Sequence, residues 1–268
     1  MNLKLNGREI TTDCKSLFAL REAYRREADV VILNGYQTND DLPLQDGDIV
    51  SLIQKGCMPS EEELESMMCA RHTPFVHEKV KGSRVAIAGL GGLGSNIAVL
   101  LARTGVGHLL LVDFDVVEPS NLNRQSYFIS HLGLPKTEAM KAQLAQINPF
   151  LQVETKTLRV TSNNAVELFR EYPIVCEAFD NPTAKAELIN TLLENCPEKQ
   201  IVAASGMAGY GSSNAIRTRR MFQNLYVCGD GETAAQVGNG LMAPRVTVCA
   251  AHQANMVLRL ILGIQSAD

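Results

Sequence analysis

The sequence predicts an α/β protein in which a doubly wound, mostly parallel sheet follows a small α+β module. From Ser83 onward, strand-like and helix-like segments alternate, which favours a parallel sheet with helices on both faces. Within that part, an apolar run passes directly into the glycine-rich stretch GLGGLG at residues 89–94. Residues 1–56 instead hold short strand-like runs around a single helix. We therefore expect three parts: a small domain over 1–56, a helical connection over 57–80 and a large nucleotide-binding domain over 81–268.

The small domain opens with a predicted hairpin. Asn6-Gly7 is a strong hairpin signal and separates two short strand-like runs. Residues 16–27 follow with apolar side chains at helical spacing. Strand-like segments at 30–33 and 49–54 complete a β-β-α-β-β order.

That order, ending in IVSLIQKG, resembles the β-grasp, ubiquitin-like fold of small sulfur carrier proteins of the ThiS type. Carriers of this type end in a free Gly-Gly, whereas here Gly56 is single and Cys57 follows it. The module therefore cannot be adenylated at its own tail, and we expect it to serve docking or regulation. An unrelated small α+β cap is the alternative, because similarity of fold does not establish a role.

The connection is expected to contain a short helix. Ser60 is a good N-cap, and three acidic residues, Glu61 to Glu63, suit the first turn of a helix. A turn at 71–74 follows, and residues 76–80 are expected to lead into the first strand of the large domain.

The large domain is read as a succession of strands and helices. The expected strands are 85–88, 109–112, 153–158, 174–178 and 201–204, with less regular ones at 214–218 and 225–227. The expected helices are 96–104, 136–147, 163–171, 184–195 and 246–261. Residues 228–240 are rich in glycine and small polar residues and could form a mobile lid.

The glycine-rich stretch predicts a Rossmann-like nucleotide site. Glycines between a strand and a helix let backbone N–H groups approach phosphate oxygens, and the helix dipole favours negative charge there. Asp113 ends the next apolar run, at the place where an acid can hold ribose hydroxyls. This pattern alone is compatible with NAD, FAD or ATP. The alternative is a glycine-rich turn that merely packs helix on strand.

Polar residues beyond Asp113 favour ATP over a nicotinamide. Arg124, Lys136 and Asp180 all follow predicted strands, so they fall at the edge of the sheet where ligands bind. Two cations and a carboxylate around a phosphate site suit a reaction in which negative charge builds on phosphorus. The alternatives are that the two cations are surface residues and that Asp180 caps the next helix.

At these residues the chain resembles the ThiF, MoeB and ubiquitin-activating-enzyme family of ATP-dependent adenylyltransferases. The shared motifs are GLGGLGS, LLLVDFD, NLNRQ, GLPK and EAFDN, between Ser83 and about Ala208. With its carrier-like module, the chain is similar to the shorter ThiF subfamily associated with sulfur transfer to thiamine. The resemblance implies that Asp113 binds the ribose with Asp115 close by. It also implies that four glycines support the ATP phosphates: Gly89, Gly91, Gly92 and Gly94.

Five further residues acquire roles from the same resemblance. Asn121, Arg124 and Lys136 would contact the phosphates. Asp180 would hold Mg²⁺. Arg71 resembles the arginine that reaches the γ-phosphate from the partner subunit, so the resemblance implies a homodimer; a surface arginine is the alternative.

Charge and hydropathy along the chain limit the kinds of binding partner and the cellular compartment that we expect. A net charge of −4 and the lack of any dense Lys and Arg run argue against nucleic acid as a partner. With no apolar stretch long enough to span a membrane and no signal-peptide pattern, the sequence predicts a cytoplasmic protein without membrane contact.

Neither zinc nor thiol catalysis is expected from the cysteines and histidines. Seven cysteines lie scattered without a C-x-x-C pair, although many relatives carry a structural zinc on two such pairs. Some relatives also use a cysteine in the loop over the active site, but here Cys228 and Cys249 have no recognisable spacing. The histidines show no metal-ligand spacing and are given no chemistry: His72, His77, His108, His131 and His252.

The resemblance implies that the protein activates the C-terminal carboxylate of a ThiS-like carrier as an acyl-adenylate. Three alternatives stay open: activation of another carboxylate or carbonyl, as on a peptide or a tRNA base; a dinucleotide oxidoreductase; and a nucleotide-binding scaffold without catalysis.

Overall fold

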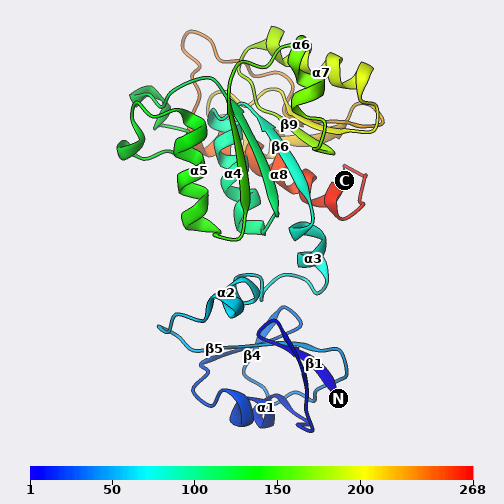
Figure 1. Ribbon diagram of the computed structural model, residues 1–268. Helices are drawn as coiled ribbons and strands as arrows, with labels where there is room; N and C mark the ends of the chain where they lie inside the picture. The colour runs from blue at the N-terminus through cyan, green and yellow to red at the C-terminus, as the bar shows by residue number, and fades with distance from the viewer. Residues whose placement is uncertain (268) are drawn as a thin grey trace. The chain divides into compact units, whose positions relative to one another are not determined.

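The computed structural model describes residues 1–267 and forms two compact units, Met1–Glu78 and a second that begins at Lys79 (Figure 1). The first contains a small mixed sheet and the second a mostly parallel one, which confirms the predicted fold class. The finer division at residues 56 and 80 stays a prediction.

The first unit is built on a five-stranded sheet in the order β2-β1-β5-β3-β4. The strands are β1 (Asn2–Leu5), β2 (Arg8–Thr11), β3 (Val30–Leu33), β4 (Tyr36–Thr38) and β5 (Ile49–Ile53). The central pair β1 and β5 is parallel, and all other pairs are antiparallel. Helix α1 (Leu17–Tyr24) begins after the N-cap Ser16 and buries Leu17 and Leu20 completely in the core of this sheet.

Two Asn-Gly turns set the register of the hairpins. Asn6 and Gly7 both have positive φ, as a two-residue hairpin turn requires, and Asn34 and Gly35 repeat this geometry between β3 and β4. Strand β4 was missing from the predicted order. Its three residues offer only Thr38 to the buried side, so no apolar alternation marks it in the sequence.

The connection is helical throughout most of its length. Helix α2 (Glu61–Met68) begins after Ser60, whose hydroxyl accepts from the backbone N–H of Glu63, as predicted. Helix α3 (Val76–Lys81) replaces the expected direct lead into a strand. Its acid in the first turn and lysines in the last turn complement the helix dipole, which favours this short helix.

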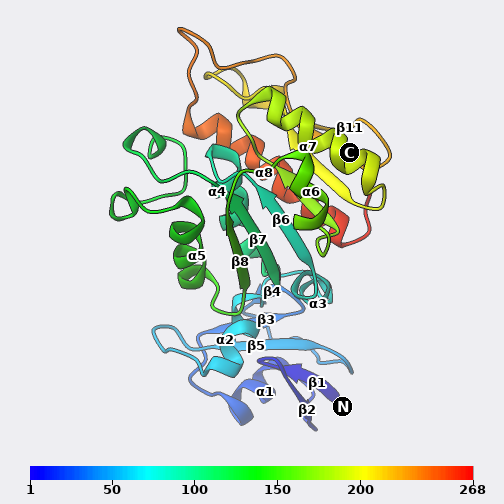
Figure 2. The same ribbon diagram turned by 45° about the horizontal axis from the view of Figure 1, so that its top comes forward.

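The second unit is built on a seven-stranded sheet in the order β11-β12-β10-β9-β6-β7-β8. The strands are β6 (Arg84–Ala88), β7 (His108–Asp113), β8 (Gln152–Thr157), β9 (Ile174–Glu177), β10 (Gln200–Ala204), β11 (Arg217–Arg220) and β12 (Leu225–Gly229). All neighbours are parallel except β11, which pairs antiparallel with β12. Figure 2 shows β8, β7 and β6 side by side. From β6 the chain first adds β7 and β8 on one side of the sheet and then β9, β10 and β12 on the other. The strand order thus reverses between β6 and β9, which is where ligands bind in doubly wound folds.

Helices cover both faces of this sheet. They are α4 (Gly92–Thr104), α5 (Lys136–Ile147), α6 (Ser162–Leu168), α7 (Pro182–Asn195) and α8 (Ala243–Ile261). Ala86 and Ala88 of β6 point into a core shared with α6 and α7, which lie side by side in both views. Ile87, between them, points to the opposite face and contacts α4 at Gly94. The inner strands, such as β6, β7 and β9, are therefore buried on both sides, which explains their nearly continuous apolar sequences, whereas the edge strands β8 and β11 are polar and largely exposed.

Three short 3-10 helices complete the described part of the second unit: Pro119–Asn121, Ile129–His131 and Ser213–Ala215. The last occupies part of a predicted strand, and Arg219 and Arg220, expected to separate two strands, instead lie within β11. Among residues 1–267 no helix is long and apolar enough to cross a membrane.

Candidate nucleotide site

The glycine-rich loop joins β6 to α4 through contacts that only glycine permits. Gly89 has a φ of +92°, and a Cβ there would lie 2.9 Å from the carbonyl oxygen of Ala178. A Cβ on Gly94 would lie 1.8 Å from the carbonyl oxygen of Gly89. Helix α4 begins at Gly92 without a side-chain cap. The loop is thus folded tightly on itself, with the positive end of a 13-residue helix at its end.

Asp113 holds this loop in place from the end of β7. Its Oδ2 accepts from the backbone N–H of Leu90 at 2.6 Å, and its Oδ1 accepts from that of Asp115 at 2.8 Å. Tyr127 donates its hydroxyl to the carbonyl of Leu90 at 2.9 Å. Burial, with a smaller contribution from the charge of Asp113, raises the pKa of Tyr127 well above its usual range, so this hydroxyl stays a donor. The predicted ribose acid therefore also positions the loop.

The NLNRQ segment brings Arg124 to the first turn of α4. The Cγ of Arg124 lies 3.5 Å from where a Cβ on Gly92 would be, and its guanidinium donates to Asn123 Oδ1 and to the carbonyl of Ser120. Asn121 is buried, and its Oδ1 accepts from the backbone N–H of Glu118. Arg124 thus lies beside the glycine loop, while the side-chain oxygen of Asn121 stabilises the turn that begins at Glu118.

Lys136 approaches the same edge from the start of α5. Its ammonium lies 3.1 Å from Asp115 Oδ2, and its backbone N–H donates to the carbonyl of Asp115. The lysine side chain is 7% exposed and that of Asp115 is 50% exposed. Because the Asp115 carboxylate is open to solvent, a phosphate oxygen can replace it as the partner of Lys136 at a small cost in free energy.

Asp180 follows β9, at the far side of the switch point. It is exposed, and among the described residues it has no hydrogen-bond or salt-bridge partner. The residue that caps α7 is Asn181, which accepts from the backbone N–H of Ala184, so the capping alternative for Asp180 is wrong.

Arg71 lies in the first unit, where its guanidinium donates to Gln37 Oε1. The other predicted site residues all lie in the second unit, around the carboxyl ends of β6, β7 and β9.

Comparison with known proteins identifies the two parts of the chain. Residues 66–268 match the ThiF family, and residues 1–56 match ThiS-like ubiquitin. The chain belongs to the ThiF family. This confirms the resemblance found in the sequence.

Relatives of this ThiF-family chain include two groups of adenylyltransferases. It is 30% identical over 200 residues to the adenylyltransferase and sulfurtransferase UBA4 of Eremothecium gossypii, covering 71% of this chain and 44% of that protein. It is 39% identical over 132 residues to the molybdopterin-synthase adenylyltransferase of Haemophilus influenzae, covering 49% of this chain and 53% of that protein. The chain thus spans about half the length of these relatives.

A solved structure shares the fold of the ThiF-family unit. The tRNA N6-threonylcarbamoyladenosine dehydratase TcdA of E. coli, in complex with AMP, superposes with a TM-score of 0.68 at 21% identity, covering 77% of this chain and 97% of that one.

The groups of this site that suit phosphate oxygens are the N-terminus of α4, Arg124 and Lys136. Gln125 Oε1 is buried without a hydrogen-bond partner, and the other end of the same amide lies 3.9 Å from where a Cβ on Gly91 would be. An amide oxygen is only an acceptor, so this atom would be satisfied by a donor such as water and not by a phosphate oxygen. Asp180 offers a free carboxylate, the ligand type that Mg²⁺ prefers.

The sequence analysis missed one ion pair at the edge of this site. Glu177, the last residue of β9, is fully buried and pairs with Lys185 of α7, while its Oε1 accepts from the backbone N–H of Phe179. Burial raises the pKa of Glu177, and the ammonium of Lys185 offsets part of this effect. The sequence signal for this ion pair is the glutamate inside the apolar run IVCEAF, since a buried carboxylate needs a partner.

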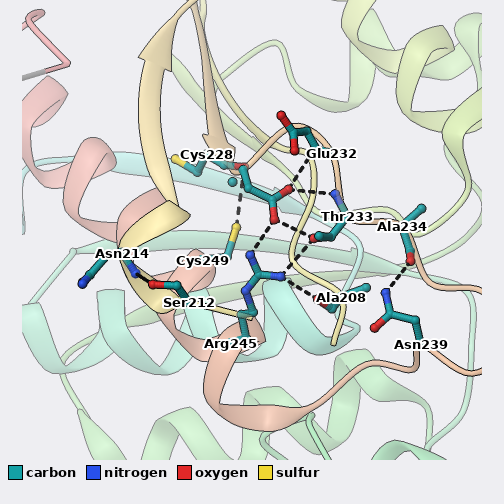
Figure 3. A network of polar contacts seen from close by, with 12 residues as sticks. Ala208, Ser212, Asn214, Cys228, Glu232, Thr233, Ala234, Asn239, Arg245 and Cys249 are labelled. Atoms are coloured by element: carbon teal, nitrogen blue, oxygen red, sulfur yellow. Dashed lines mark hydrogen bonds and ion pairs between the residues drawn. The ribbon is translucent and has the colours of Figure 1, made fainter. Parts of the chain in front are cut away.

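A second missed network ties residues 230–233 to α8 (Figure 3). Arg245 donates to Asp230 Oδ2 at 2.5 Å, to the carbonyl of Ala208 at 2.6 Å and to Thr233 Oγ1 at 3.0 Å. Burial alone would raise the pKa of Asp230, but hydrogen bonds from Thr233, Glu232 and Arg245 hold it well below its usual range. The first part of the predicted lid is therefore anchored.

The anchored loop ends next to the nucleotide site. Asn123 Nδ2 donates to the carbonyl of Leu241 at 3.3 Å, and Val246 Cγ1 lies 3.0 Å from where a Cβ on Gly92 would be.

Burial raises the pKa of Cys228 to about 11 and that of Cys249 to about 12, so both thiols stay protonated near neutral pH.

Proposed function

We propose that this protein is an ATP-dependent adenylyltransferase that activates the C-terminal carboxylate of a ThiS-like sulfur carrier, in the sulfur transfer that builds the thiazole of thiamine. The observation that carries the proposal is that Arg124 packs against the first turn of α4, after β6, while Lys136 pairs with Asp115, after the neighbouring parallel strand β7. The names of the adenylyltransferase relatives support the reaction type. The ThiS-like module supports a sulfur carrier as the substrate class.

In the proposed reaction, a carrier carboxylate oxygen attacks the α-phosphorus of ATP. The new bond joins that oxygen to phosphorus, and the bond from the α-phosphorus to its bridging oxygen breaks, so that its electron pair leaves with pyrophosphate. The carboxylate is already ionised near pH 7, so no general base is needed. The protein's contribution is to position the reactants and to neutralise charge.

Each site residue has one part in this proposal. The glycine loop and the N-terminus of α4 hold phosphate oxygens, with Arg124 beside them. Lys136 releases Asp115 and neutralises the leaving pyrophosphate. Asp180 would hold Mg²⁺, which supplies further neutralisation of the phosphates when bound. We also propose a homodimer in which Arg71 of one protomer reaches the γ-phosphate in the other.

ATP–pyrophosphate exchange tests the proposal. Purified protein with Mg²⁺ is assayed with and without a free carrier that ends in Gly-Gly, and exchange is expected only with the carrier. Lys136→Ala and Asp180→Ala should each lower the exchange rate at least on the order of 100-fold, as loss of a charge-stabilising group does. Lys141→Ala, an exposed lysine on the same helix α5, is the matched control and should leave the rate unchanged.

Two outcomes would contradict parts of this proposal. Normal exchange in the Lys136 and Asp180 variants would refute the site assignment. Tight ATP binding without exchange for every carrier tried would refute the carrier as substrate, and would favour another carboxylate or a nucleotide-binding scaffold.

A further inference from the structure

A cysteine and two histidines of the first unit converge at the end of the helical connection. Cys69, His72 and His77 each bring one potential ligand atom within 4.8 Å of those of the other two. The imidazole centroids of His72 and His77 lie 6.0 Å apart. The three residues are half-buried and come from one short stretch, C-x2-H-x4-H. From the sequence we expected no zinc and gave His72 and His77 no chemistry, but the structure brings them together with Cys69. We propose that they form a Zn²⁺ site, distinct from the nucleotide site of the second unit.

The backbone is shaped to bring these three side chains together. The backbone N–H of His72 donates to the carbonyl of Cys69 at 2.9 Å, which turns the chain directly after α2. Phe75 has a φ of +66° although it is a bulky residue, and this left-handed turn starts α3, which carries His77. Such a conformation costs on the order of 1–3 kcal/mol and persists where the surroundings impose it.

The β3–β4 turn holds this stretch against the small sheet. A Cβ on Gly35 would lie 2.5 Å from the carbonyl oxygen of His72, so the two backbones are in direct contact. Arg71 is hydrogen-bonded to Gln37 of β4 on the same side. The cluster is thus built on the folded module rather than on a free segment.

The donor set suits zinc. Nδ1 of His72 is buried and has no hydrogen-bond partner, an arrangement that a bound cation would satisfy. One thiolate and two neutral imidazoles are ligands that tetrahedral Zn²⁺ accepts, with water in the fourth position. On binding, the S–H bond of Cys69 breaks, its proton goes to solvent and the sulfur's electron pair forms the Zn–S bond.

Glu65 supports the proposed site from α2. Its Oε1 lies 3.5 Å from Nε2 of His77. A carboxylate on one nitrogen of a histidine fixes the ring and its tautomer for metal binding through the other nitrogen. Glu65 is therefore a positioning residue for His77.

Metal binding by the full chain tests this proposal. Protein purified without added chelator should contain one Zn²⁺ per chain. Removal of zinc and addition of Co²⁺ should produce a thiolate-to-cobalt charge-transfer band and the visible bands of tetrahedral coordination. Cys69→Ser should abolish the charge-transfer band and the bound zinc. Cys57→Ser, an exposed cysteine of the same connection, should change neither.

Two further variants distinguish a proposed zinc ligand, His72, from the residue proposed to position a ligand, Glu65. His72→Ala should lose stoichiometric zinc, whereas Glu65→Gln should keep it with an affinity lowered on the order of 10–100-fold. Wild-type protein without stoichiometric zinc and without the cobalt bands would overturn the proposal. Full cobalt bands in Cys69→Ser, or binding of copper in place of zinc, would overturn it as well. ATP–pyrophosphate exchange is a separate readout, so failure of either proposal leaves the other testable.

Discussion

Replacing Arg245 by alanine should destabilise the second unit strongly, because it breaks a buried ion pair. The side chains of Arg245 and Asp230 are 5% and 9% exposed. The substitution leaves the Asp230 carboxylate without its cation and removes the donor to the carbonyl of Ala208. Breaking a buried pair costs about 3–5 kcal/mol. Because Asp230 keeps two backbone N–H donors, we expect the lower end, about 3 kcal/mol.

Thermal unfolding followed by circular dichroism measures this effect. For a unit of this size each kcal/mol shifts Tm by about 2–4 °C, so Arg245→Ala should lower Tm by roughly 6–12 °C. Arg103→Ala, an exposed arginine of α4, is the control and should shift Tm by less than about 2 °C. A fall of less than about 2 °C in Arg245→Ala would refute the reasoning.

The pH dependence provides a second check on the same pair. The pKa of Asp230 is lower in the folded protein than its value of about 3.9 in the unfolded chain. The resulting stability is therefore complete above about pH 4 and is lost as the pH falls through the folded pKa. Arg245→Ala raises the folded pKa, so the Tm difference between variant and wild type should shrink as the pH falls below about 4. A constant difference would contradict this assignment.

Three further predictions concern the loop and a helix cap. Gly94→Ala should abolish ATP binding in an equilibrium binding assay, since its Cβ would meet the carbonyl oxygen of Gly89 at 1.8 Å; Gly240→Ala, where nothing lies within 4 Å, should bind ATP normally. Tyr127→Phe should lower the free energy of unfolding in urea by about 1–3 kcal/mol, because a buried carbonyl in the glycine loop loses its donor, and an unchanged unfolding midpoint would contradict this. Ser60→Ala should cost about 1 kcal/mol and speed amide exchange in α2, whereas unchanged exchange would mean that the cap contributes nothing.

Much of the fold could be predicted from local sequence patterns. Asn6-Gly7, the cap at Ser60 and the glycine loop each specify their structure through steric and hydrogen-bonding requirements of a few adjacent residues. Helix α5 has the predicted bounds, Lys136–Ile147. Strand β4 and helix α3 were not predicted, because short elements with mixed burial carry little periodicity of their own.

The sequence by itself determined the ThiF-family resemblance and the doubly wound order, and it predicted a set of polar residues for the nucleotide site. Tertiary structure alone decided which polar side chains pair with one another. It paired Lys136 with Asp115, left Asp180 free and brought Asp230 to Arg245 across 15 residues of chain. It also gathered Cys69 with His72 and His77. Such contacts depend on where backbone turns and packed elements place each side chain, and spacing along the chain does not specify that placement.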